Sequence, residues 1–99
     1  MAVVANSSSF QGAVIEIGTF TLDPASIADN SQGIETVTVA GAKVGDLVFI
    51  NGEALPLGAI IAGAKVTATN TVSVYINNET GGALDIGSKT WDYLLVKLS

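Results

Sequence analysis

The sequence predicts an all-β protein: a Greek-key or jelly-roll-like β-sandwich of about seven or eight strands in a single domain. Three observations predict this class. Eleven Val, nine Ile and nine Thr stand among 99 residues, and β-branched side chains fit a pleated sheet better than a helix. Turn signals containing Gly, Pro or Asn recur about every 8–12 residues between short alternating runs. No window of about 11 residues carries a helical stripe.

Residues 1–12 are expected to form an N-terminal arm, and residues 13–99 the sandwich domain. The first strand is predicted over residues 13–22, with a bulge near Gly18, where no single alternation fits the whole run. Asp23-Pro24 ends that strand because proline lacks a backbone donor. Residues 25–33 are expected to form a loop.

Further strands are predicted over residues 36–39, 46–50, 59–69, 71–76 and 91–98. Asn51-Gly52 indicates a type I′ or related turn, and Gly63 a bend within the 59–69 strand. Residues 46–50 are apolar on both faces. Residues 71–76 give the clearest period-two pattern, with Val72, Val74 and Ile76 facing inward. The predicted core is Val14, Val37, Val39, Phe49, Val66, Val72, Val74, Ile76, Leu94 and Val96.

Composition excludes several kinds of chemistry. The chain has no Cys, His or Arg, so the common zinc sites, thiolate or imidazole nucleophile pairs and guanidinium phosphate clamps are excluded. A net charge of −5 disfavours nucleic acid and anionic lipid as partners. The apolar run Met1–Ala5 is too short and lacks the basic start of a signal peptide, and Ala54–Ala64 is too short to span a bilayer. We expect a protein made in a cytoplasm, with no membrane segment.

No candidate catalytic, cofactor or metal site stands out. The glycine-rich turns Gly41–Gly45 and Gly81-Gly82 lack the Lys-Ser/Thr ending and the following helix of a phosphate loop. Asp23, Asp29 and Glu35 cluster in sequence, but their spacing does not match a calcium loop. The Asn78-Glu79-Thr80 sequon matters only in a secretory pathway. The sequence therefore predicts a non-enzymatic protein without metal or cofactor.

Trp91 and Tyr93 are two residues apart and so share one face of the last strand. Such a pair can stack on a sugar or enter a partner's pocket; the alternative is that both rings pack at the edge of the protein's own core. Charged residues are only 13% of the chain, which favours a surface that another molecule covers. Because few lysines guard the sheet edges, we expect a homotrimer that covers them.

Residues 36–98 resemble a recurring module in small virion proteins of tailed bacteriophages. The matching residues are Ala40–Asp46 with Val48, Ala54-Leu55-Pro56, Gly58, Ala64, Val66, Ala68, Thr71–Val74, Asn78-Glu79-Thr80, Asp85 and Tyr93. In similar sequences a Pro tends to follow the residue equivalent to Asp85, whereas here Ile86 stands. Most of these residues are turn and core types, so they specify a fold better than an activity, and the first 35 residues lie outside the resemblance.

The resemblance implies a β-sandwich virion protein of the capsid decoration or cement type. Such a protein sits on the outside of the phage head, binds the major capsid protein and stabilises contacts between its subunits. The arm lies outside the resemblance; because it is apolar at its tip and polar in its middle, we expect it to be flexible when free and to order on the shell, anchored by Val3, Val4 and Phe10. The alternative is a tail-fibre or receptor-binding module that grips host carbohydrate through Trp91, Tyr93 and Tyr75.

Overall fold

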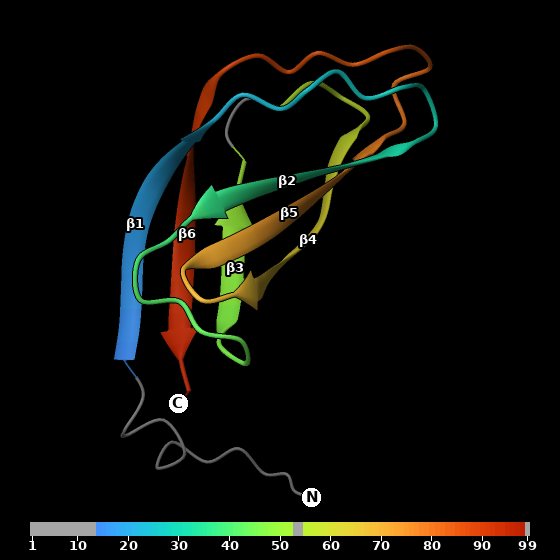
Figure 1. Cartoon of the computed structure of the whole chain (residues 1–99). Coiled ribbons are helices and arrows are strands. Elements are labelled where there is room, and N and C mark those ends of the chain that lie inside the picture. The colour runs from blue at the N-terminus through green and yellow to red at the C-terminus, as the bar shows by residue number, and fades with distance from the viewer. Residues whose placement is uncertain (1–13, 53–54, 99) are drawn as a thin grey trace, which may run out of the picture.

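The runs rich in Val, Ile and Thr form strands in the computed structural model, which describes residues 14–52 and 55–98 (Figure 1). Within those residues there are six strands and no helix, so the predicted all-β class is confirmed. The strands are β1 (Val14–Leu22), β2 (Gln32–Thr38), β3 (Leu47–Asn51), β4 (Ala59–Ala68), β5 (Thr71–Asn78) and β6 (Lys89–Lys97). The predicted arm, residues 1–12, lies outside the described residues.

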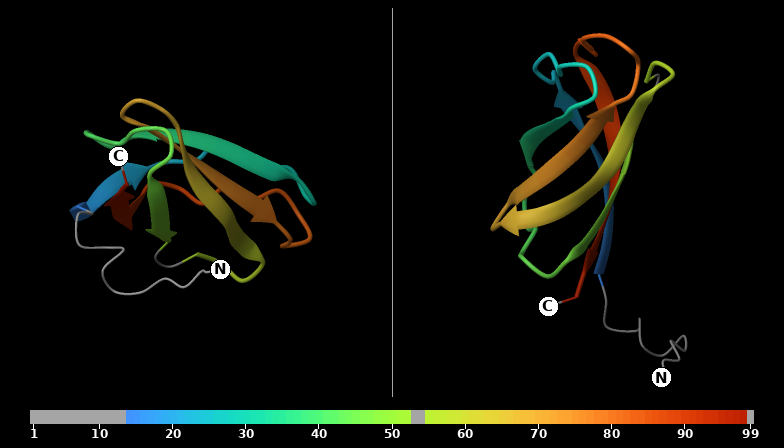
Figure 2. Two further views of the ribbon diagram at one scale, coloured as in Figure 1. Left: turned by 90° about the horizontal axis from the view of Figure 1, so that it is seen from below. Right: turned by 90° about the vertical axis from the view of Figure 1, so that its right-hand side faces the viewer.

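The strands form two three-stranded sheets, with the orders β1-β6-β3 and β2-β5-β4. All neighbouring strands are antiparallel, and Figure 2 shows the sheets stacked as two layers. Of the consecutive strands described, only β4 and β5 are neighbours in one sheet; each other connection passes from one sheet to the other. The predicted sandwich is therefore confirmed, with its central strands, β5 and β6, last in the chain.

The described residues contain six strands where the sequence predicted about seven or eight. The chain between them includes two long connections, 23–31 and 79–88, which meet only in an isolated bridge between Ile27 and Leu84. The two backbone hydrogen bonds of this bridge measure 2.8 and 2.9 Å. Pro24 has no N–H to donate, and Gly81-Gly82 favours a turn, so neither segment extends the bridge into a ladder.

Two local predictions are wrong and one is confirmed. β1 pairs with β6 in an unbroken register, so there is no bulge at Gly18. The type I′ turn is not present at Asn51-Gly52, because neither residue has a positive φ; these residues also join no hairpin, since β3 pairs with β6 while β4 pairs with β5. The bend near Gly63 is present: the register of β4 against β5 shifts between Ile61 and Gly63.

The core lies between the inner faces of the two sheets. On β5, Val72, Val74 and Ile76 are fully buried, as the period-two pattern predicted. Trp91 and Leu95 of β6 are buried in the same cluster. The members of the predicted core that are buried on the inner side are Val39, Val66, Val72, Val74 and Ile76, and Val37 packs against them.

The predicted core is wrong in part for the β1-β6-β3 sheet. Val14 and Phe49 are more than half exposed, and the half-buried Leu94 alternates with the inward-facing Leu95 and so lies on the outer face. Val96 is buried, as predicted, although it too alternates with Leu95. The physical reason is that β3 and β6 are apolar on both faces, so alternation alone does not say which face points inward.

Candidate interaction surface

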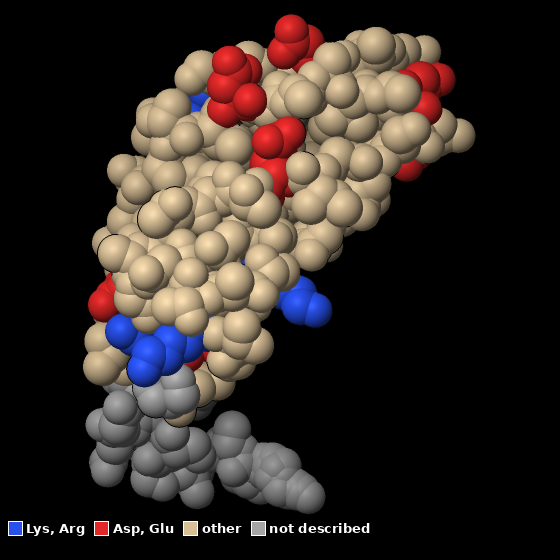
Figure 3. Space-filling view, viewed as in Figure 1, with Lys and Arg blue, Asp and Glu red and all other residues tan. Residues whose placement is uncertain are grey.

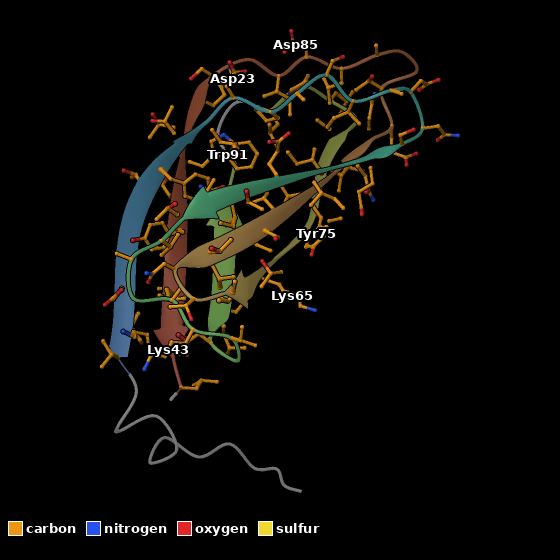
Figure 4. The ribbon with its side chains drawn as sticks, in the orientation of Figure 1. Asp23, Lys43, Lys65, Tyr75, Asp85 and Trp91 are labelled. Atoms are coloured by element: carbon orange, nitrogen blue, oxygen red, sulfur yellow. The ribbon has the colours of Figure 1, made fainter. Side chains whose placement is uncertain are left out.

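The aromatic residues of β6 point into the sandwich, as Figure 4 shows for Trp91. Trp91 is fully buried. The ring of Phe20 on β1 stacks against the rings of both Trp91 and Tyr93, with centroids 6.2 Å apart in each case. The prediction that Trp91 binds a partner is therefore corrected: its ring is enclosed by the protein's own core, which was the alternative reading of this pair.

Tyr93 is half-buried and packs against the same core. Its ring covers Gly18, its cross-strand neighbour on β1; a Cβ atom at position 18 would lie 2.6 Å from the Tyr93 hydroxyl oxygen. Tyr75 lies on β5 in the other sheet, and its side chain alternates with the inward-facing Val74 and Ile76. The three aromatic residues proposed to grip a sugar therefore do not form one site.

The remaining predicted partner-binding residues are Val3, Val4 and Phe10. All three lie outside the described residues. Their role as anchors of the arm stays a prediction.

The outer face of the β1-β6-β3 sheet is apolar over two adjoining cross-strand rows. One row is Ile17, Leu94 and Phe49, and the next is Ile15, Val96 and Leu47. Ile17 is 80% and Phe49 57% exposed, whereas on the central strand Leu94 is half-buried and Val96 is buried. We refer to these six residues as the apolar outer face. Single exposed apolar side chains are ordinary, but a contiguous patch on one sheet face is typical of a surface that binds another molecule.

A shallow groove of about 300 Å³ crosses this face. Ile17 and Phe49 stand on the two edge strands, and Leu94 lies between them on β6. Asn51 and Asp92 line the groove at its polar side, next to the third cross-strand row of Thr19, Asp92 and Asn51. The surface is thus a concave apolar strip with one carboxylate beside it.

The outer face of the other sheet has a different character. Its cross-strand pairs are mainly polar: Thr38 with Thr71, Thr36 with Ser73 and Gln32 with Asn77. The Gln32 amide donates a hydrogen bond to the Asn77 side-chain oxygen at 2.8 Å. Ile34 and Ile60 are exposed there, but they stand among these hydroxyl and amide groups. The two outer faces are therefore not equivalent, and the apolar one is the candidate interaction surface.

Charge is unevenly spread along the molecule. In the view of Figure 3, acidic side chains gather at one end, where Figure 4 labels Asp23 and Asp85 in the long connections. Lysines gather near the opposite end, around Lys43, while Lys65 projects from the side. On the face seen in Figure 3, the surface between the two ends is largely uncharged.

The turn before β3, over residues 40–46, is held by the side chain of Asp46. Its carboxylate accepts hydrogen bonds from the N–H groups of Lys43 and Leu98, both at 3.0 Å. Burial of the carboxyl would raise the pKa of Asp46, but the two N–H donors, together with the charges of Lys97 and Lys43, outweigh it and lower the pKa from 3.8. Asp46 therefore joins the β2–β3 connection to the end of β6 as an ionised group.

Asn78 joins the two long connections at the other end of the sandwich. Its side chain is fully buried, and its amide nitrogen donates to the carbonyls of Ile27, Ala28 and Gly82 at 2.7–3.1 Å. Its amide oxygen accepts from the N–H and hydroxyl of Thr80 at 2.9 and 2.7 Å. Asn78 of the sequon therefore has a structural role in this fold, because its amide is buried and both its nitrogen and its oxygen are hydrogen-bonded within the protein.

The acidic residues weighed as a calcium site do not converge. Among residues 14–52 and 55–98, no three His, Cys, Asp or Glu side chains lie close enough together to hold a metal ion, and this covers Asp23, Asp29 and Glu35. The Glu35 carboxylate instead accepts a hydrogen bond from the Ala25 N–H at 3.0 Å. The same part of the chain contains no helix long and apolar enough to cross a membrane.

Sequence reasoning missed Ile15, Ile17, Leu47 and Phe49 as surface residues. A signal was present, because residues 46–50 read as apolar on both faces. In a two-layer sandwich each sheet has one covered face, so a strand that is apolar on both faces leaves one apolar face outside.

Comparison with known proteins finds no match to this chain among family models, curated proteins or solved structures.

Proposed function

We propose that this protein is a decoration or cement protein of a tailed-bacteriophage head, which binds the outer surface of the shell and stabilises contacts between major capsid subunits. The observation that carries the proposal is the apolar outer face. Two adjoining apolar rows on one sheet, beside a polar outer face on the other, are typical of a protein that works by binding proteins. The resemblance of residues 36–98 to virion modules is the reason for proposing a phage head as the place where the protein binds.

The residues that carry the resemblance have structural tasks in this fold. Ala42 is buried in the core, Asp46 and Asn78 hold connections through their hydrogen bonds, and Tyr93 packs over Gly18. The resemblance therefore supports a shared scaffold. A scaffold of this size, repeated over a shell, needs only weak contacts at each site because many sites act together.

Attachment to the shell is proposed to run through the N-terminal arm, with Val3, Val4 and Phe10 as anchors. Burying three such side chains is worth about 5–7 kcal/mol gross. Fixing ten residues costs on the order of 10 kcal/mol in backbone entropy, so the arm also needs strand hydrogen bonds to the capsid protein.

The copy number of the protein in purified virions tests this function. We expect a copy number on the order of hundreds, found with the heads after heads and tails are separated, because decoration follows the repeat of the shell. Purified protein should also rebind heads from which it has been stripped.

A handful of copies that fractionate with tails would overturn the proposal in favour of a tail-fibre or receptor-binding module. The carbohydrate version of that alternative has lost support, since Trp91 is enclosed and Tyr75 lies on the other sheet.

A further inference from the structure

We infer that Asn51 is a site of spontaneous covalent modification. Its side-chain amide deamidates through a cyclic imide formed with the backbone nitrogen of Gly52. The product carries a carboxylate at position 51, directly across the ladder from Asp92. The reaction needs only water and no partner, so it goes beyond the proposed function; its effect on shell binding rests on that function.

The reaction is an intramolecular acyl transfer that consumes one molecule of water. Hydroxide removes the Gly52 N–H proton, and the nitrogen attacks the side-chain carbonyl carbon of Asn51, which is held close to it by the chain. A carbon–nitrogen bond forms, the bond to the side-chain NH2 breaks, and ammonia leaves with a proton from water. Water then opens the five-membered imide at either carbonyl, so the products are aspartate and isoaspartate, and nothing is oxidised or reduced. Glycine suits position 52 because it has no Cβ beside the attacking nitrogen.

The place of Asn51 at the end of a strand makes this approach possible. The extended backbone of a strand holds the next nitrogen away from the side chain, so the pairing at Asn51 must open first. Asn51 is the last residue of β3, its pair with Asp92 is the last one in the β3–β6 register, and its side chain is exposed. Opening one terminal pair costs much less than global unfolding. The reaction therefore proceeds in the folded protein.

Three of the five asparagines that the structure describes are held by hydrogen bonds. The Asn70 side-chain oxygen accepts from the Gly41 N–H at 2.8 Å, and the Asn77 oxygen accepts from the Gln32 amide at 2.8 Å. The amide of Asn78 is fully buried. Each of the three is also followed by a residue that has a side chain. They are therefore expected to react more slowly than Asn51.

Asn30 is the internal control. It is exposed like Asn51 and lies in a connection, but Ser31 follows it. Because a Cβ next to the attacking nitrogen hinders ring closure, Asn30 is expected to react more slowly in spite of its exposure.

The core packing fixes the glycine that favours the reaction. A Cβ at position 52 would lie 2.7 Å from Ile61 Cδ1, 3.0 Å from Leu55 Cδ1 and 3.2 Å from Trp91 Cζ3. A larger residue there would have to displace core side chains. The variants that test the reaction therefore change Asn51 and leave Gly52 in place.

The product places two carboxylates side by side at the groove. Cross-strand partners have Cβ atoms about 5 Å apart, and like charges in this position are unfavourable. Asn51 and Asp92 line the same groove as Ile17 and Phe49. A second charge beside these apolar side chains raises the cost of covering them with a partner. Modified protein is therefore expected to bind heads less tightly than fresh protein.

Tryptic peptides separate the asparagines, because cleavage after the lysines places Asn51 alone in residues 44–65. The full chain is kept folded in warm buffer for several weeks, digested and analysed by mass spectrometry. Residues 44–65 should gain the mass difference between OH and NH2 and become a substrate of an isoaspartate-specific carboxyl methyltransferase, faster at mildly alkaline than at neutral pH. Residues 1–43 and 66–89, which hold the other asparagines, should react more slowly. Asn51→Gln should abolish the change in residues 44–65, whereas Asn30→Gln should leave it as it is.

The opposite results overturn the inference. An unmodified 44–65 peptide would mean that the end of β3 does not open, and equal rates in all three peptides would mean that the fold does not select Asn51. A gain in mass without isoaspartate would exclude the cyclic imide.

The effect on binding is tested separately with stripped heads. Asn51→Asp should rebind them several-fold more weakly than Asn30→Asp, which adds the same charge at an exposed position of a connection. Equal binding of the two variants would exclude the effect of the carboxylate. Because the modification is measured on the protein alone, it and the head-binding proposal fail separately.

Discussion

Asn78 shows how one side chain can hold two connections. Its amide makes five hydrogen bonds in a fully buried position, and removing it leaves the carbonyls of Ile27, Ala28 and Gly82 without this donor. Asn78→Ala should therefore lower the free energy of unfolding by about 2–4 kcal/mol, measured by urea denaturation. The neighbouring Asn77→Ala removes one exposed hydrogen bond and should cost less than about 1 kcal/mol. Equal losses for the two variants would contradict this role.

Asp46 makes part of the stability depend on pH. Because its pKa in the folded state is lowered from 3.8, the ionised carboxylate stabilises the fold above pH 4, and this contribution is lost as the pH falls through the folded-state value. Asp46→Asn should melt at a lower temperature than the wild type at pH 7, with the difference shrinking as the pH is lowered below about 4. The exposed Asp29→Asn serves as the control. A difference that stays constant from pH 7 to pH 3 would mean that the charge of Asp46 is not what holds the turn.

Gly18 and Tyr93 form a cross-strand pair whose packing can be tested at the level of the β1–β6 ladder. A Cβ at position 18 would lie 2.6–2.8 Å from the end of the Tyr93 ring, so Gly18→Ala must displace that ring and should cost about 1–3 kcal/mol. Gly82→Ala meets no atom within 4 Å and should be nearly neutral. In a Tyr93→Leu background the cost of Gly18→Ala should fall, as a double-mutant cycle would measure. The same cost in both backgrounds would exclude this contact as the reason for the glycine.

How well the sequence predicted each element depended on how many of its faces are apolar. β5 is apolar on one face, so its orientation followed from alternation. β3 and β6 are apolar on both, and there alternation predicted Phe49 and Leu94 as core residues, whereas Trp91 and Leu95 occupy the inside. The core residues Ile27, Leu84 and Ile86 were missed, because single apolar residues in connections show no period.

The candidate interaction surface was likewise predicted only in part, because residue type and alternation did not say which side chains point inward. Trp91 was considered for binding because aromatic side chains are common at interfaces, but it is equally suited to fill the core between two sheets. The excess of apolar residues on β3 indicated that one face of this strand would be apolar on the outside. Its location on the molecule required the pairing of β1, β6 and β3, which are far apart in sequence.

At the scale of the whole molecule, the arm and the sandwich are predicted to be separable. Deleting residues 2–10 should leave the melting temperature unchanged, because the six strands and the core residues that the structure describes all lie within residues 14–52 and 55–98. The same deletion should weaken binding to stripped heads, measured by co-sedimentation. Wild-type affinity of the shortened protein would show that the arm takes no part in attachment.

The order of strands in the sheets also bears on how the chain is made. β1 and β3 each pair with β6 in their sheet, and β2 and β4 each pair with β5, yet β5 and β6 follow the other four described strands in the chain and are synthesised after them. Until residues 71–97 emerge, the first four strands have no partner, and their apolar faces and free edges are open to other chains. We therefore expect folding to begin only after β5 and β6 have emerged and to be slower than in a protein with local contacts. A truncation that removes β6 should leave an aggregating polypeptide, because it takes away the shared ladder of an entire sheet.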